Sequence, residues 1–266
     1  MKFQKKLAIL GSSILLGFSA SASASVIDMF DVSQTGIQDT SIDGTFEFSS
    51  VSTGLANEII GNNRDIGVSL EENLSSSLFP TSIGVAGGFL SFNSASGVKA
   101  IGVVQWDGAN SDLSLDTTGL GGVDITDGGN LSLFRVETNN SDLGFTFTIT
   151  IWDMAGEYVT VGLASHEVAP FQDPGQISYL GLNTWDTCDA TGVGFIDCST
   201  PAIGVDLTSV GAIELIINPL GAGGQADIDL SLSSITTVPE PSSLGLLGAG
   251  LFASGFAANR KKNKKA

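Results

Sequence analysis

The sequence predicts an all-β fold, a two-sheet, jelly-roll-like sandwich. Glycine is abundant, at 34 of 266 residues, and short runs of Val, Ile, Phe and Thr are broken by Gly and Asp. Period-two alternation is clearest in FTFTITI at 145–151, where the large apolar residues face one way and the threonines the other, as a half-buried strand requires. Many short strands with turn signals between them are typical of sandwiches and barrels.

The chain begins with a segment that has the three parts of a secretory signal. A basic start, MKFQKK, precedes an apolar and small run at 7–20, and an Ala/Ser ladder follows it. The run is shorter than the roughly 20 residues that span a bilayer, which argues against a retained membrane helix. We expect signal peptidase to cleave after Ala24, so residues 1–24 are interpreted as a signal peptide.

Residues 25–237 read as one β-sandwich ectodomain, because no fixed-period repeat and no clear linker interrupts them. The last strand, DIDLSLS at 227–233, alternates as strictly as the strand at 145–151. Clusters of Gly, Asn and Asp at 127–130 and 139–142 predict turns. The other strands are expected at 27–32, 45–49, 65–70, 88–92, 99–106, 131–137, 158–165, 176–180 and 212–218.

The two cysteines, Cys188 and Cys198, lie close together in the sequence. In an oxidising compartment a disulfide between them would close a small loop and add roughly 2–3 kcal/mol of stability. The alternative is a metal pair, but no further Cys or His lies nearby. We therefore favour the disulfide.

Residues 238–266 have the features of a stop-transfer tail. Pro239 and Pro241 flank Glu240 and make a stiff extended hinge. An uncharged stretch follows, and we expect a single transmembrane helix at 243–258. Its residues 244–258 would be about 22 Å long as a helix. The basic cluster behind it should stay on the cytoplasmic side.

This order of a PEP motif, a short apolar helix and a basic terminus resembles the PEP-CTERM sorting signal of Gram-negative bacteria. The resemblance implies an exosortase-type processing enzyme as a partner, with Pro239, Glu240 and Pro241 as the recognition residues. It also implies a localisation: exported, anchored in the inner membrane in transit, and then at the cell surface or extracellular.

The ectodomain resembles a type that recurs on many PEP-CTERM proteins. The similarity lies in GNNRD at 61–65, QWDG at 105–108, GLGGVDIT at 119–126 and DLTSVGAIEL at 206–215. No catalytic activity is assigned to that type, so the resemblance supports the fold and says little about chemistry. The stretch between the cysteines looks like an insertion relative to the pattern.

The charge distribution excludes nucleic acid as a partner. Between the signal and the basic terminus the only basic residues are Arg64, Lys99 and Arg135, whereas all 28 acidic residues lie between Asp28 and Glu240, which gives this part of the chain a net charge of about −25. Such a surface repels phosphate backbones and anionic lipid, and it attracts divalent cations.

Few catalytic signatures occur in the chain. His166 is the sole histidine and no Gly-x-Ser-x-Gly elbow is present, which argues against nucleophilic hydrolysis and zinc chemistry. Two carboxylates could hydrolyse glycosides, but with 28 acids no pair stands out. Trp106 and Trp152 each precede an aspartate and could stack on a sugar, although a position in the core is the simpler interpretation.

Structural calcium is the one metal that the sequence suggests. Oxygen-rich loops between strands suit a hard cation, although Asx residues are also the usual builders of turns. No EF-hand spacing is present. The candidate ligands form two loops: Asp107, Asn110 and Asp112 in the first, and Asp124, Asp127 and Asn130 in the second.

Two functions remain open. The first is a non-catalytic structural or adhesive role at the cell envelope or in the extracellular matrix. The second is a carbohydrate-binding module for extracellular polysaccharide, which would be indicated if Trp106, Trp152 or Trp185 were exposed on one concave face. A glycan-active enzyme is less favoured.

Overall fold

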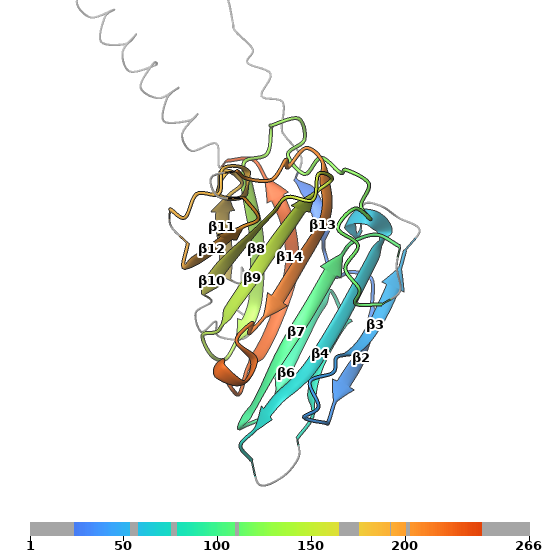
Figure 1. The fold of residues 1–266 in the computed structure, drawn as a ribbon. Helices are drawn as coiled ribbons and strands as arrows, with labels where there is room; N and C mark the ends of the chain where they lie inside the picture. The colour runs from blue at the N-terminus through green and yellow to red at the C-terminus, as the bar shows by residue number, and fades with distance from the viewer. Residues whose placement is uncertain are drawn as a thin grey trace, which may run out of the picture.

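A computed structural model describes residues 24–240, except 54–57, 76–78, 110–111, 165–175, 192 and 201–202. Two antiparallel seven-stranded sheets pack face to face, so the predicted all-β sandwich is confirmed (Figure 1). Sheet A has the order β11-β8-β14-β6-β5-β2, with β1 also paired to β14. Sheet B has the order β12-β10-β9-β13-β7-β4-β3.

The chain crosses repeatedly between the two sheets and places one or two consecutive strands in one sheet before it passes to the other. Sheet A comprises β1 (Ser25–Asp28), β2 (Gln34–Asp39), β5 (Thr81–Ala86), β6 (Phe89–Ser94), β8 (Leu133–Ser141), β11 (Gln176–Gly181) and β14 (Asp229–Val238). Sheet B comprises β3 (Glu47–Ser52), β4 (Asn63–Asn73), β7 (Val98–Trp106), β9 (Thr146–Asp153), β10 (Tyr158–Ala164), β12 (Phe195–Cys198) and β13 (Val210–Ile217).

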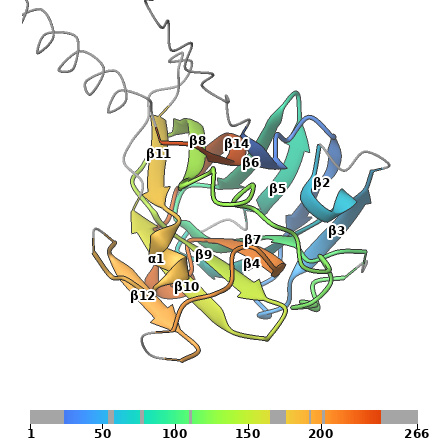
Figure 2. The ribbon, with the colours of Figure 1, turned by 90° about the horizontal axis from the view of Figure 1, so that it is seen from above.

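Short helices complete the described chain: η1 (Ile60–Asn62), α1 (Asn183–Asp186) and η2 (Gly221–Gly223). Seen from above, α1 lies beside β12 at one side of the sandwich, and β2 and β3 lie at the other (Figure 2). The core is the space between the sheets. Trp106 and Trp185 are fully buried in it, and the rings of Phe134 and Trp185 are 5.2 Å apart.

The alternating stretch at 145–151 behaves as predicted on its apolar side. Phe147, Ile149 and Ile151 all lie in the core. On the other side Thr146 is exposed, but Thr148 and Thr150 are buried by neighbouring side chains rather than open to solvent. This difference shows that the outer face of sheet B is itself partly covered.

Two expected boundaries are wrong for local reasons. The strand expected at 27–32 ends at Asp28, because the Asp28 carboxylate accepts a hydrogen bond from the Phe30 N–H (2.8 Å) and Phe30 has a left-handed φ of 55°. The turn expected at 139–142 is instead the end of β8, since Asn140 pairs with Ser231 of β14.

One buried ion pair ties β1 to sheet B. The Arg64 guanidinium donates to both oxygens of Asp28 at 2.9 and 3.0 Å, and neither side chain is exposed. The remaining donors are used as well: Arg64 Nε reaches Gln34 Oε1 at 2.8 Å, and Trp106 Nε1 donates to Asp28 Oδ2 at 2.9 Å. A buried charge pair is tolerated when its other lone pairs and protons are satisfied in this way.

Four segments meet at one end of the sandwich: 61–65, 105–108, 119–126 and 206–215. Backbone hydrogen bonds join Leu120 to Gly211 (2.9 Å) and Ile125 to Leu207 (3.1 Å). A Cβ on Gly119 would lie 1.7 Å from the Asp107 carbonyl oxygen. The glycines of these segments therefore allow backbone to pack directly on backbone.

Candidate binding face

The outer face of sheet B carries a row of polar side chains that crosses all seven strands. The register places one member on each strand, and each lies opposite the next across an antiparallel pair. We call this the polar row: Ser50, Asp65, Gln105, Glu214, Thr150, Thr160 and Asp197.

Hydrogen bonds link the polar row pairwise. Ser50 donates to Asp65, and Gln105 Nε2 donates to Glu214 Oε2 at 2.7 Å. The hydroxyls of Thr150 and Thr160 are 2.8 Å apart. Cross-strand pairs of this kind hold the register of the sheet and fix the direction of each side chain.

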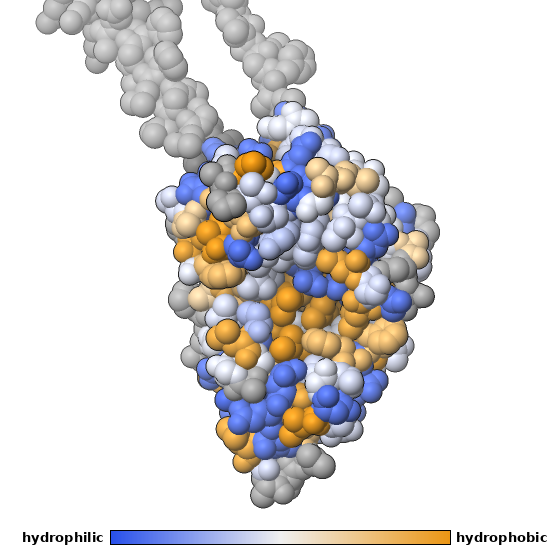
Figure 3. Space-filling view, viewed as in Figure 1, coloured by the Kyte–Doolittle hydropathy of each residue, from blue (hydrophilic) through white to orange (hydrophobic). Residues whose placement is uncertain are grey.

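The neighbouring row is apolar and small in its middle and has a phenylalanine at each end. We call it the apolar row: Phe48, Gly67, Val103, Ile216, Thr148, Gly162 and Phe195. Phe48 and Phe195 are 48% and 54% exposed. Figure 3 shows hydrophobic side chains gathered across the middle of this face, with hydrophilic ones bordering them.

The two glycines of the apolar row make room for side chains above the sheet. A Cβ on Gly162 would lie 2.9 Å from the Cβ of Phe195, and one on Gly67 would lie 2.4 Å from a methyl carbon of Leu113. Any larger residue at either position would displace these side chains. The two glycines, which have no side chain, therefore help to determine the shape of this face.

The tryptophans are not gathered on this face. Trp106 and Trp185 are buried in the core. Trp152 is half-buried on the outer side, with its ring 6.2 Å from that of Tyr158. Of the three tryptophans that would have indicated a carbohydrate-binding module, one at most is accessible.

Acidic groups cluster where β4 and β7 reach the loop that follows Trp106. Burial raises the pKa of Asp65 to about 6, and the negative charges of Asp107 and Asp112 act in the same direction. Burial also raises the pKa of Glu214, and the charge of Asp107 adds to this. The ionised forms of Asp65 and Glu214 are thus disfavoured both by burial and by the negative charge of Asp107.

The two loops expected to bind calcium differ in their surroundings. In the first, Asp107 Oδ2 accepts the Asp116 N–H at 2.8 Å, and Asn110 lies outside the described residues. In the second, Asp124 accepts hydrogen bonds from Thr126 and Gly128, which lowers its pKa. In the described part of the chain, no three His, Cys, Asp or Glu side chains are grouped so as to hold a metal.

The second loop is closed by a further bond, in which Asn130 Nδ2 donates to the Asp127 carbonyl at 2.7 Å. These contacts are those of an Asx-rich turn. Calcium binding by either loop stays a prediction.

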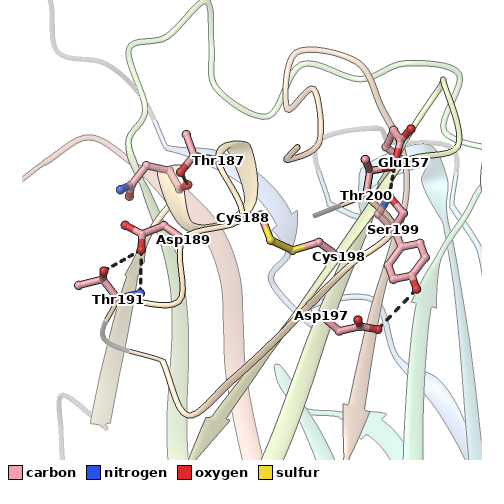
Figure 4. Close-up of a disulfide and its surroundings, with 11 residues drawn as sticks. Glu157, Thr187, Cys188, Asp189, Thr191, Asp197, Cys198, Ser199 and Thr200 are labelled. Atoms are coloured by element: carbon pink, nitrogen blue, oxygen red, sulfur yellow. Dashed lines mark hydrogen bonds between the residues drawn. A yellow bond between two sulfur atoms is a disulfide. The ribbon is translucent and has the colours of Figure 1, made fainter. Parts of the chain in front are cut away.

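A disulfide joins Cys188, just after α1, to Cys198 at the end of β12, with 6.4 Å between the Cα atoms (Figure 4). The strand β12 is the edge of sheet B and carries Phe195 and Asp197. Beside the disulfide, Glu157 accepts hydrogen bonds from Ser199 and Thr200 (Figure 4). The end of the apolar row is thus anchored by a covalent bond and by a carboxylate.

The sorting motif begins where the sandwich ends. Val238 is the last residue of β14 and pairs with Leu133, and Pro239 follows directly. Glu240 lines a cavity of about 510 Å³ between the 126–133 loop and α1. Pro241 and the helix expected at 243–258 lie outside the described residues, and within those residues no helix is long and apolar enough to cross a membrane.

Comparison with known families identifies the tail. Residues 237–261 match the PEP-CTERM protein-sorting motif. The chain therefore carries the sorting motif of an exported protein that passes through the membrane and is a substrate of exosortase. Among curated protein sequences, none matches this chain.

Solved structures give only remote likenesses. A family 11 carbohydrate-binding module of a Clostridium thermocellum cellulosomal cellulase has a TM-score of 0.36 and 7% identity, over 83% of this chain and 96% of the module. A family 30 module from the same organism has a TM-score of 0.36 and 14% identity, over 82% and 99%. An agarase has a TM-score of 0.38 and 17% identity, over 66% of this chain and 24% of the agarase. Likenesses this weak say nothing of what the chain binds.

Proposed function

We propose that this exported protein is a non-catalytic adhesive protein of the cell surface or extracellular matrix, and that it binds extended polysaccharide across the outer face of sheet B. The observation that carries the proposal is the apolar row beside the polar row, running across seven strands between Phe48 and Phe195. After export, exosortase-type processing of the tail would place this face outside the cell.

The chemistry of the two rows suits a sugar chain. Exposed phenyl rings can pack on the apolar faces of pyranose rings. The carboxylates and threonine hydroxyls beside them accept hydrogen bonds from sugar hydroxyls and fix the orientation of the ligand. Because the apolar row crosses all seven strands from Phe48 to Phe195, it suits a polymer better than a small molecule.

A hydrolase is less consistent with the arrangement. Asp65 has the raised pKa that a general acid needs, but its side chain is completely buried. A general acid must come within hydrogen-bond distance of the bond it protonates. The groups of the polar row that the solvent can reach are mainly Glu214, Thr160 and Asp197.

The test is binding of the processed protein to the extracellular polysaccharide of its host, measured by affinity electrophoresis. We expect Phe48→Ala and Phe195→Ala each to weaken binding about tenfold, equivalent to about 1.4 kcal/mol. The matched control is Tyr179→Ala, which removes an aromatic ring of similar exposure (49%) from β11 in sheet A. If Phe48→Ala and Phe195→Ala bind the polysaccharide as tightly as Tyr179→Ala does, the outer face of sheet B is not the binding face. If shortened sugars are released, the protein is an enzyme.

A further inference from the structure

Glu214 places a carboxylate at the centre of the outer face of sheet B. It is the middle member of the polar row and lies between Gln105 of β7 and Thr150 of β9. Gln105 Nε2 donates to Glu214 Oε2 at 2.7 Å and so orients the carboxylate, while part of the Glu214 side chain stays open to solvent. Ile216, two residues further along β13, belongs to the apolar row. A polymer lying along the two rows therefore passes beside an oriented carboxylate.

Glu214 has no basic partner among the described residues. Between the signal peptide and the basic terminus the chain has only three Lys or Arg side chains. Arg64 is completely buried on the core side of sheet B, and Arg135 lies on β8 of sheet A. Lys99 pairs with Glu72 at 2.8 Å, and it lies six residues before the β7 partner of Glu214, about 20 Å along the strand.

The missing cation affects the ionisation of this carboxyl. Burial raises the pKa of Glu214, and no basic group opposes the shift. A positive charge brought to the face by a ligand would favour the ionised form of Glu214, because opposite charges at short range stabilise each other. The centre of the face is thus suited to a ligand that carries a cation.

A second carboxylate of the face lies beside an exposed aromatic ring. Phe195 and Asp197 are both exposed, and they alternate on β12 so that both side chains leave the outer face of sheet B, about 7 Å apart along the strand. A carboxylate attracts an ammonium group by charge, and the face of a phenyl ring attracts it as well. The phenyl ring also packs on apolar C–H groups. An apolar sugar ring that bears an ammonium group matches both side chains.

We propose that the outer face of sheet B selects a polysaccharide of amino sugars whose amino groups are free. This inference rests on the proposed function and adds to it the class of sugar. Glu214 binds one ammonium group at the centre of the face, and Asp197 with Phe195 binds another at the β12 edge. Such charge-assisted hydrogen bonds are roughly twice as strong as neutral ones. Polysaccharides that carry carboxylates or sulfates are repelled by the same groups.

The experiment is a calorimetric titration of the full chain in detergent with two matched probes, a glucosamine hexamer and an N-acetylglucosamine hexamer. The two probes have the same backbone, but in a mildly acidic buffer only the first carries positive charge on its nitrogen atoms. We expect the glucosamine hexamer to bind about tenfold more tightly. Added salt should reduce this preference, because it screens charges that are partly exposed.

Glu214→Gln removes the charge and keeps an oxygen that can accept the hydrogen bond from Gln105, so this variant should lose most of the preference. The matched control is Glu137→Gln on the outer face of sheet A, where the Glu137 side chain is also part-buried (23% exposed). It changes the net charge by the same amount and should keep the preference. Asp197→Asn at the exposed edge should lower the preference as well, and it tests the proposal if Glu214→Gln does not fold.

The proposal is overturned if the native chain binds the two hexamers equally or binds neither, or if Glu137→Gln loses as much preference as Glu214→Gln. It is also overturned if polylysine binds as tightly as the glucosamine hexamer, because the face would then attract any polycation. In each case the proposed function stands as long as the chain binds the polysaccharide of its host through Phe48 and Phe195. Loss of binding to that polysaccharide as well would remove the proposed function itself.

Discussion

Ser25 lies directly opposite Thr237 in the antiparallel pair of β1 with β14. Ser25 is the first residue after the expected signal-peptidase site, and Thr237 comes two residues before Pro239. The two ends of the domain thus form one strand pair at the same end of the sandwich (Figure 1). Because β14 is the last strand, β1 pairs only after the whole domain has been made.

This arrangement separates the sorting motif from the fold. Replacing Pro239, Glu240 and Pro241 by alanine should block tail removal and leave the unfolding temperature unchanged, because all three follow the last paired residue, Val238. Intact mass of the protein from its native host measures the first effect, and circular dichroism measures the second. Normal removal of the tail in this variant would mean that the motif is not the recognition element.

A second prediction concerns the buried Arg64–Asp28 pair. Arg64→Met removes one partner and leaves the Asp28 carboxylate buried, which should lower the free energy of unfolding by about 3–5 kcal/mol. Lys99→Met is the control, because its pair with Glu72 is partly exposed and should contribute less than about 1 kcal/mol. Urea unfolding distinguishes the two. If the two variants lose the same free energy of unfolding, the buried pair contributes no more to stability than the partly exposed pair.

A third prediction concerns the glycine contacts at the end of the sandwich. Gly119→Ala places a methyl group 1.7 Å from the Asp107 carbonyl oxygen, so the backbones must separate, and we expect a loss of at least about 3 kcal/mol. Gly194→Ala meets nothing nearer than 3.7 Å and should change stability by less than about 1 kcal/mol. Thermal unfolding of both variants measures the difference. Native stability in Gly119→Ala would contradict the close packing described here.

Alternation along the chain predicted most strands because burial on one side leaves a local signature. The strand at 145–151 is the best example, since every second residue enters the core. By contrast β2 (QTGIQD) and β5 (TSIGVA) were not predicted. Gly36 and Gly84 pack against each other there, and strands this short, with few large apolar residues, leave only a weak pattern.

The candidate site could not be predicted from the sequence, because its two rows exist only through the pairing of seven strands. Asp65, Gln105 and Glu214 are far apart in the chain, and a shift of one residue in any register would disperse them. The sequence segments GNNRD and QWDG did contain Asp65, Gln105 and Asp107. What they could not show was that Arg64 and Trp106 point into the core while their neighbours point outward.

The last prediction concerns the edge of the binding face in acid. Glu157 accepts hydrogen bonds from Ser199 and Thr200, and these lower its pKa below the usual 4.5. A carboxyl whose pKa is lower in the folded state stabilises the fold fully above its unfolded pKa and loses that effect as pH falls through the folded value. We expect β12 to loosen as the pH falls below 4.5 and through the lowered pKa of Glu157, seen as lower hydrogen-exchange protection of Phe195–Cys198 after correction for intrinsic rates.

Glu157→Gln should show the loosened edge already at neutral pH and little further change in acid, because its side chain does not titrate. Asp189→Asn is the control, since the Asp189 carboxyl also has a lowered pKa but accepts its hydrogen bonds from Thr191 in its own turn. The disulfide keeps β12 attached in every variant, so the expected change is local opening and not global unfolding. Unchanged protection of β12 in Glu157→Gln would show that Cys188–Cys198 alone holds this edge.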